Sequence, residues 1–585
     1  MGTQSLVAEL QRRRVFRALV GYGIGAFAVL QIVEPVMHGL HWPDEVLSYV
    51  VVALAVGFPI VVSLAWIFDV NAGRIERTGP AAGGGPKGLR LGLLLVGIGV
   101  LAAAPGVIWY FAVRGHARSV PSSAAGTVAA TPSIAVLPFA DMSPGKDQEY
   151  FSDGIAEEIL NALAQVEGLQ VTGRTSSFSF KGKNEDLRNI GQKLGVGAVL
   201  EGSVRKEGNR VRVTAQVIKV ADGFHLWSQT FDRKLTGIFA VQDEIAKAVV
   251  EALKVKLLPG ALSSNVHPPR DPEAYRQYLL GRSLMLLETE DGERRATAAL
   301  EKAIALDPTY APAWERLATV RGNAALDAPQ AEVQQRTREA LDAVERGIAL
   351  EPDYYHGYAV RGWLRSGMWD WSGAQKDMER ALSLGPNTLI TLHLNAVILH
   401  RVGRLKEAVA AQRKATEIEP LGSAIWANLG AYLMEDGQLE AARVAYGKAL
   451  EISPENVSAA KELAIVDLLE GHATRTLAAM EKLPREADRL MGSAIAQHDL
   501  GHAPESQRAL DELVAKGEGE PDIAYRIASV HGWRGERDSA FDWLDRAYVR
   551  RDPGLRLVKV DPILRNLRRD ARYTAFLKKM NLPTD

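Results

Sequence analysis

The sequence contains no cysteine, and its charges almost cancel. Missing thiols exclude disulfides, cysteine nucleophiles, cysteine metal sites and a lipid-acceptor cysteine. With 69 Lys plus Arg against 70 Asp plus Glu, the whole chain lacks the basic charge typical of nucleic-acid binding. At 585 residues it is too long for one hydrophobic core, so several domains are expected.

Long apolar runs occur only near the N-terminus. Each has about the 20 residues that a helix needs to cross hydrocarbon, which predicts three transmembrane helices within residues 15–113. The expected spans are about 16–33, 46–68 and 91–113. Four arginines lie between residues 12 and 17 and further basic residues precede the third run, whereas the first loop has none. The positive-inside rule then places residues 1–14 in the cytoplasm and residues after about 114 in the periplasm, on a bacterial inner membrane.

A compact α/β pattern follows a Ser-, Ala- and Pro-rich linker at 114–132. Over residues 133–258 we expect a short strand at "IAVLPF", a helix at "FSDGIAEEILNALAQV" and a second strand at "LQVTGRTSSF". The stretch "LEGSVRKEGNRVRVTAQVIKVADGFHLWSQTFDR" alternates apolar and polar residues around turn signals, which predicts a three-stranded antiparallel meander. Its basic and aromatic residues could suit nucleic acid, but acidic residues nearly offset the basic ones.

Three ordered segments of this region resemble the TolB amino-terminal-like (TolB/FlgO-type) domain of bacterial membrane and signalling proteins. They are "SIAVLPFADMSPGKDQEYFSDGIAEEILNALAQ", "FKGKNEDLRNIGQKLGVGAVLEGSV" and "NRVRVTAQVIKVADGFHLWSQTFDR". In that family the domain occurs beside adenylate cyclase or winged-helix modules, often with helical repeats after it. The resemblance implies an accessory or sensing role, and it supplies no catalytic residue.

Four carboxylates precede or begin the predicted helix of this domain, at Asp141, Asp147, Glu149 and Asp153. A paired acid/base site is conceivable there. Turn formation and helix capping explain the same residues more simply, because Asp and Ser are common at both positions. We therefore predict no enzyme activity, no catalytic residue, no metal site and no cofactor.

A 34-residue period begins after a second linker at 259–273. It separates Pro386, Pro420 and Pro454, and also Gly403, Gly437 and Gly471. Paired antiparallel helices with this spacing are typical of the tetratricopeptide repeat. We expect about eight units over 274–552 and a polar capping segment over 553–585. The predicted fold class is thus multi-domain: three transmembrane helices, a TolB-like α/β domain and an all-α repeat solenoid.

The concave face of such a solenoid typically binds an extended peptide or a helix. Arg361, Asn395 and Asn428 lie on expected first helices where packing does not require them, so they are candidate partner-binding residues. The leading hypothesis is a membrane-anchored periplasmic scaffold or sensor for protein or peptide partners, with no nucleic acid and no small-molecule substrate.

The alternative is an accessory component of a signalling system. A nucleotide cyclase would need a further domain, and no unassigned segment of the sequence is left for one. A winged-helix regulator would need more than the 14 or so residues expected before the first span. Regulation through a partner stays open.

Overall fold

The computed structural model describes residues 131–255, 267–287, 289–326, 330–517 and 522–584, with a few short segments nearer the N-terminus. The chain divides into two compact units, residues 1–129 and 130–585. In the first unit, β1 (Phe68–Asn71) and β2 (Arg74–Arg77) form an antiparallel hairpin. The other helices and strands named below belong to the second unit.

The predicted fold class needs a correction at its N-terminal end. Among the helices of the described residues, none has both the length and the apolar character needed to cross a membrane. The longest of them, α12 (Gln330–Leu350), is rich in charged residues. The spans expected at 16–33, 46–68 and 91–113 fall almost entirely outside the described residues. The fold class becomes an α/β domain followed by an all-α repeat array, and the location of the chain stays a prediction.

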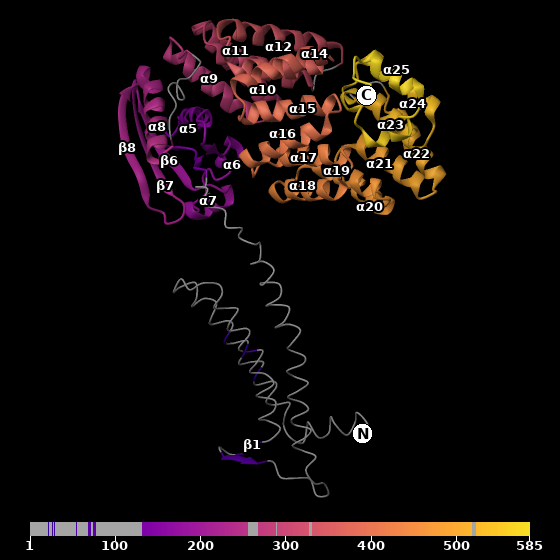
Figure 1. The fold of residues 1–585 in the computed structure, drawn as a ribbon, viewed down its shortest axis with the longest axis horizontal. Coiled ribbons are helices and arrows are strands. Elements are labelled where there is room, and N and C mark those ends of the chain that lie inside the picture. Colours follow the sequence, from indigo (N-terminus) through magenta and orange to yellow (C-terminus); the bar gives the residue numbers. More distant parts are fainter. Residues whose placement is uncertain are drawn as a thin grey trace. The chain divides into compact units, whose positions relative to one another are not determined.

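The α/β domain is built on a mixed sheet with the strand order β5-β3-β6-β7-β8, in which β4 also pairs with β6. Figure 1 shows β6, β7 and β8 side by side in this sheet. β3 is parallel to β5 and β6, whereas β6, β7 and β8 form the predicted antiparallel meander. The strands are β3 (Ser133–Val136), β4 (Ala140–Asp141), β5 (Gln170–Val171), β6 (Ala198–Glu207), β7 (Arg210–Lys219) and β8 (His225–Lys234).

Helices cover both faces of this sheet. Alternation along β3 sends Ile134 and Val136 to the face covered by α5 (Glu149–Ala164) and α8 (Ile238–Ala252). Ala135, and Leu137 just after the strand, face α7 (Leu187–Leu194) on the other side of the sheet. The core under α5 and α8 continues into the first repeat helices, so the domain and the array share one hydrophobic cluster.

Two local expectations in this domain were wrong. The segment "LQVTGRTSSF" is a strand only at β5, and α6 (Arg174–Phe178) follows it. The helix α5 begins at Glu149, ahead of Ser152 and Asp153, which lie buried inside it rather than capping it. Asp153 accepts a hydrogen bond from Lys181.

Within the described residues, the repeat array contains eight consecutive helix pairs. The first helices are α9 (Pro272–Met285), α11 (Ala311–Leu326), α13 (Tyr355–Gly367), α15 (Leu389–Arg401), α17 (Ser423–Glu435), α19 (Val457–Leu469), α21 (Glu486–Asp499) and α23 (Ile523–Trp533). Their partners are α10 (Glu290–Leu306), α12, α14 (Trp371–Leu384), α16 (Leu405–Ile418), α18 (Leu439–Ile452), α20 (Ala473–Met480), α22 (Ala503–Ala515) and α24 (Arg537–Arg550).

The α17/α18 pair shows why the period produces this packing. A Cβ at Gly430 would lie 2.7 Å from the Tyr446 ring, so only glycine allows the two helices to approach so closely. Gly437 adopts a φ of 81° in the turn between them. The Trp426 indole N–H donates to the carbonyl of Pro420 at 2.9 Å, which holds this unit against the end of the one before it.

The C-terminal segment packs back onto the array. It contains η3 (Pro553–Leu557), η4 (Pro562–Asn566) and α25 (Ala571–Lys579). Its apolar side chains share a cluster with α23, α24 and Trp371 of α14. The Trp371 indole N–H donates to the carbonyl of Met580 at 2.8 Å, across 209 residues of chain.

Candidate protein-binding groove

The α/β domain contacts the array first at α9. Gly154 of α5 lies against Leu279, so close that an added Cβ would be 2.6 Å from its Cδ2. The Arg282 guanidinium is 7% exposed and pairs with both Glu157 and Glu158 of α5. Burial acts to raise the pKa of Glu157, but Arg282 and Arg174 hold that pKa below its usual value. The charges of this contact are therefore mutually compensated, as burial requires.

The second contact lies more than 100 residues further along the array, at the loop between α16 and α17. The carboxylate of Glu419 accepts hydrogen bonds from the backbone N–H groups of Thr175 and Ser176, at 2.9 and 2.7 Å. These are the free N–H groups at the start of α6, whose own N-cap residue, Gly173, has no side chain to accept them. Glu419 is only 1% exposed, and burial raises its pKa.

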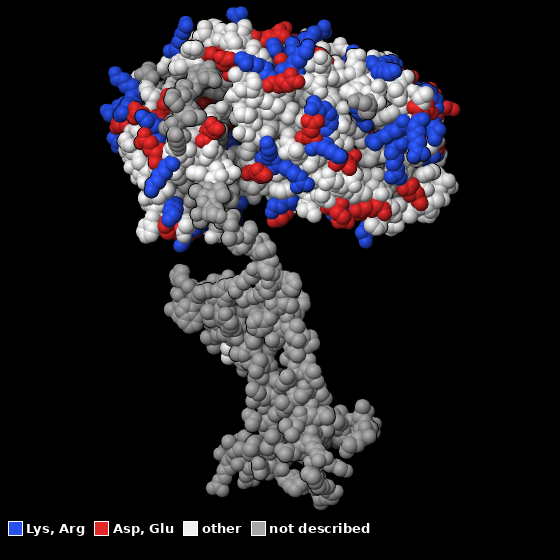
Figure 2. All heavy atoms as spheres, viewed as in Figure 1, with Lys and Arg blue, Asp and Glu red and all other residues white. Residues whose placement is uncertain are grey.

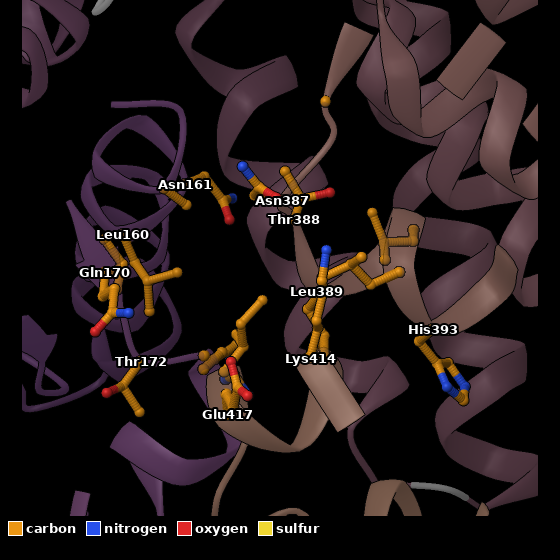
Figure 3. Close-up of a pocket in the computed structure, with 18 of the residues that line it drawn as sticks. Leu160, Asn161, Gln170, Thr172, Asn387, Thr388, Leu389, His393, Lys414 and Glu417 are labelled. Atoms are coloured by element: carbon orange, nitrogen blue, oxygen red, sulfur yellow. The ribbon is translucent and has the colours of Figure 1, made fainter. Parts of the chain in front are cut away.

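A cavity of about 1250 Å³ lies between these two contacts. Figure 3 shows its walls: Leu160, Asn161, Gln170 and Thr172 come from the α/β domain, whereas Leu389 and His393 come from α15. Lys414 and Glu417 of α16 also reach it. Both are exposed, so they lie where the cavity meets solvent. The first helices α13 and α15 and the edge of the sheet thus line one groove.

The groove is lined mainly by neutral polar and apolar groups. Burial lowers the pKa of both His356 and His393, which keeps these imidazoles uncharged near neutral pH. The Nδ1 atom of His356 is buried and has no hydrogen-bond partner within the described part of the chain. Burial acts to lower the pKa of Arg316, but its neighbour Glu315 raises that pKa above its ordinary value. Amide groups and two neutral imidazoles therefore face an occupant of the groove, and Arg316 is one of the cationic side chains in the lining.

None of the three predicted partner-binding residues lines this cavity. Arg361 forms a bidentate ion pair with the buried Asp377 of α14, at 2.6 and 3.0 Å, so its side chain is used within its own repeat. Asn395 and Asn428 are half-buried on α15 and α17. The cavity is lined instead by His356, Val360 and Trp363 of α13, together with Ile390 and His393 of α15. Partner binding by the predicted three stays a prediction.

The predicted candidates omit the lining residues because the repeat period alone does not show which side of a first helix faces the α/β domain. A helical period of 3.6 would have grouped His356, Val360 and Trp363 on one face, separate from Arg361. Three of the four carboxylates predicted in the α/β domain also have structural partners, since Glu149 and Asp153 pair with Lys181. Asp141 accepts hydrogen bonds from the N–H groups of Ser143 and Gln148, both at 2.8 Å, as a turn residue does.

Elsewhere in the described residues, Asp467, Glu470 and His472 lie close enough to hold a metal ion. Arg443 Nη2 already donates to both carboxylates, at 2.7 Å to Asp467 and 2.5 Å to Glu470. A guanidinium there supplies the positive charge that an ion would bring. We assign this cluster to an ion-pair network.

Basic residues of the meander are paired with an acidic residue of the neighbouring strand. Arg210 and Arg212 on β7 both pair with Asp232 on β8, at 3.0 and 2.8 Å. Figure 2 shows acidic and basic side chains interspersed over this part of the molecule. The basic residues of the meander are thus partly neutralised by their neighbours across the strands.

Comparisons with known proteins agree with the two-part fold of the second unit. Residues 129–248 match the family described as "HilA/YgeH-like transcriptional regulator, second domain". The family matched there is therefore not the TolB-like one that the motifs resemble. Residues 423–456 match the tetratricopeptide repeat, which confirms the repeat family of the array.

One curated relative is the putative adenylate cyclase 3 of Rhizobium meliloti (strain 1021). It is 42% identical over 217 residues, which are 36% of this chain and 37% of that protein. The chain therefore spans little more than a third of this relative.

Solved structures of repeat proteins are also similar. PilW, a type IV pilus biogenesis factor, is 22% identical, with 34% of this chain and 93% of that chain covered and a TM-score of 0.30. A thermophilic tetratricopeptide protein of Thermus thermophilus is 20% identical, with 33% and 99% covered and a TM-score of 0.29. At these TM-scores the likeness carries no argument about function.

Proposed function

We propose that this protein is a non-catalytic component of a signalling or regulatory system, and that it binds a segment of a partner protein in the groove between its α/β domain and its repeats. The observation that carries this proposal is the cavity of about 1250 Å³ on the concave face of α13 and α15. Ligand sites are usually concave and partly apolar with a few oriented polar groups, and this cavity has those features.

In this proposal the α/β domain is an accessory module. Its resemblance to the TolB amino-terminal-like domain, and its match to the second domain of a transcriptional regulator, support a module that senses or transmits rather than one that catalyses. Of the carboxylates that could have formed an acid/base pair, Asp141 belongs to a turn, and Glu149 and Asp153 pair with Lys181.

Photo-crosslinking in cells tests the binding site. A photoreactive amino acid replaces His393, which lines the groove, or Val444 of α18, which is 70% exposed and outside it. We expect a discrete protein adduct from position 393 and none of that mass from position 444. Identical adducts from both positions, or none from position 393, would contradict the proposal.

The name of the Rhizobium relative raises a second candidate function, the formation of a cyclic nucleotide. Purified full-length protein incubated with ATP and Mg²⁺ or Mn²⁺ distinguishes the two. The proposed role predicts no cyclic AMP above a no-enzyme control. Turnover that follows the protein through purification would favour the cyclase instead.

A further inference from the structure

We infer that the partner segment binds in an extended conformation, as an added strand on the open edge of β5. This inference rests on the proposed function and names how the same groove recognises its partner. β5 is the last strand in the sheet order, and among the described strands it pairs with β3 alone. An unpaired edge offers main-chain donors and acceptors to another extended chain.

The hydrogen bonds of β5 show which of its groups face outward. The N–H groups of Gln170 and Thr172 donate to the carbonyls of Pro132 and Ile134 in and beside β3, both at 2.9 Å. Successive residues of a strand direct their backbone groups to opposite edges. The N–H and carbonyl of Val171 therefore point away from β3, toward the open edge.

Main chain from outside the sheet already pairs with this edge at one position. The N–H of Gly173, two residues beyond Val171 and on the same side of the strand, donates to the carbonyl of Ile418 at 2.7 Å. Ile418 belongs to the end of α16, in the repeat array. An added strand would continue this existing contact along the edge, past Val171 toward Leu169.

The cavity supplies the room for such a strand. Every residue from Gly168 to Arg174 lines it, and so does Ile418. Figure 3 shows Gln170 and Thr172 on one wall, with Leu389 and His393 of α15 on the other. A strand on β5 would thus have its backbone against the sheet edge and half of its side chains against the concave face of the repeats.

The lining also indicates the chemistry of the segment. Asn161 and Asn387 offer amide groups, and the imidazoles of His356 and His393 are held neutral by burial. The exposed Lys414 and Glu417 carry opposite charges within one turn of α16. Main-chain and amide contacts suit an uncharged peptide segment with apolar side chains toward Val360 and Trp363, rather than a strongly acidic or basic one.

Selection from a phage-displayed library of linear peptides of about twelve residues tests this on the full-length protein. We expect enriched peptides to be uncharged, and their affinity to fall by about tenfold or more in Val171→Pro. That variant removes the outward N–H and leaves a peptide carbonyl unpaired, at a cost of about 1.4 kcal/mol or more. Val171→Thr keeps the N–H and the branched side chain, so it should bind within about twofold of the wild type.

The outcomes separate this inference from the proposed function. Peptides that lose binding in His393→Ala but bind Val171→Pro normally would overturn strand addition and leave the groove as the site. Peptides insensitive to both variants, or no enrichment at all, would overturn both.

A second measurement covers the case in which Val171→Pro does not fold. Hydrogen exchange in the wild type should slow at residues 168–173 when a selected peptide binds, because the Val171 N–H becomes bonded. Unchanged exchange there, with protection elsewhere in the groove, would count against the added strand. A second copy of the chain bound through β5 would appear as a concentration-dependent dimer and would also overturn the inference.

Discussion

The two halves of the repeat array differ in what covers their inner surfaces. The C-terminal half is covered by the C-terminal segment that begins at η3. The apolar side chains of this segment are fully buried at Leu555, Val558, Leu564 and Leu567. The N-terminal half faces the α/β domain across a cavity, with contacts at α9, at the loop after α16 and between Gln165 and Tyr355 of α13. A repeat surface that is packed with side chains stabilises the fold, whereas one that borders a cavity has room for a ligand.

The largest expected effect is a difference in the stability that is lost when each of two leucines is replaced by alanine. Leu564→Ala removes a fully buried side chain and should lower the free energy of unfolding by about 2–5 kcal/mol, because a cavity remains in a packed core. Leu389→Ala, in the half-buried cavity wall, should cost about 1 kcal/mol or less. Denaturant unfolding measures both, and equal losses would show that the two halves are equally packed.

The stability of the C-terminal half should also depend on pH. Burial raises the pKa of Asp552 and of Asp561 to about 6. The folded state then binds more protons than the unfolded state between about pH 4 and 6, so these two groups stabilise at low pH and lose that contribution as pH rises through 6. Each group contributes a slope of about 1.4 kcal/mol per pH unit within this window.

Replacing Asp561 by Asn tests this dependence, because Asn resembles the protonated carboxyl. Asp561→Asn should flatten the slope between pH 4 and 6 and make the protein more stable than the wild type near pH 7. Asp545→Asn, at a side chain 61% exposed, is the matched control and should leave the slope unchanged. A slope that Asp561→Asn does not alter would rule out this carboxyl as its source.

A smaller loss of stability is expected at the contact between Glu419 and the start of α6. Glu419→Ala removes the acceptor for two N–H groups of α6 and should cost about 1–2 kcal/mol, the range for a lost N-cap. Faster hydrogen exchange at residues 174–178 would report it locally. Glu417→Ala, two residues earlier and exposed, should leave exchange there unchanged. If both variants behave alike, Glu419 does not hold the domain in place.

The sequence predicted the repeats well because their signal is local and periodic. Gly403, Gly437 and Gly471 recur at 34 residues and all adopt a positive φ in the turn between paired helices. The antiparallel meander was equally readable, since its alternation and turn residues lie within 34 residues of chain.

The groove could not be predicted in the same way, because it depends on contacts between distant segments. The stretch "GRTSSF" reads as a strand by propensity, yet α6 forms because Glu419, more than 240 residues away, caps its first N–H groups. Nothing in the local pattern around "EIEP" distinguishes Glu419 from an ordinary residue at a helix end. Arg361 was predicted to bind a partner because the local sequence does not show its ion pair with Asp377, which lies on the paired helix.

Hydrogen exchange of the full-length protein, with and without its crosslinked partner segment, tests the central claim most directly. The account predicts slower exchange on both walls of the cavity, over residues 160–174 and 387–394, and no change over the closing segment 553–567. Protection confined to the closing segment or to the outer helices, with both cavity walls unchanged, would contradict it.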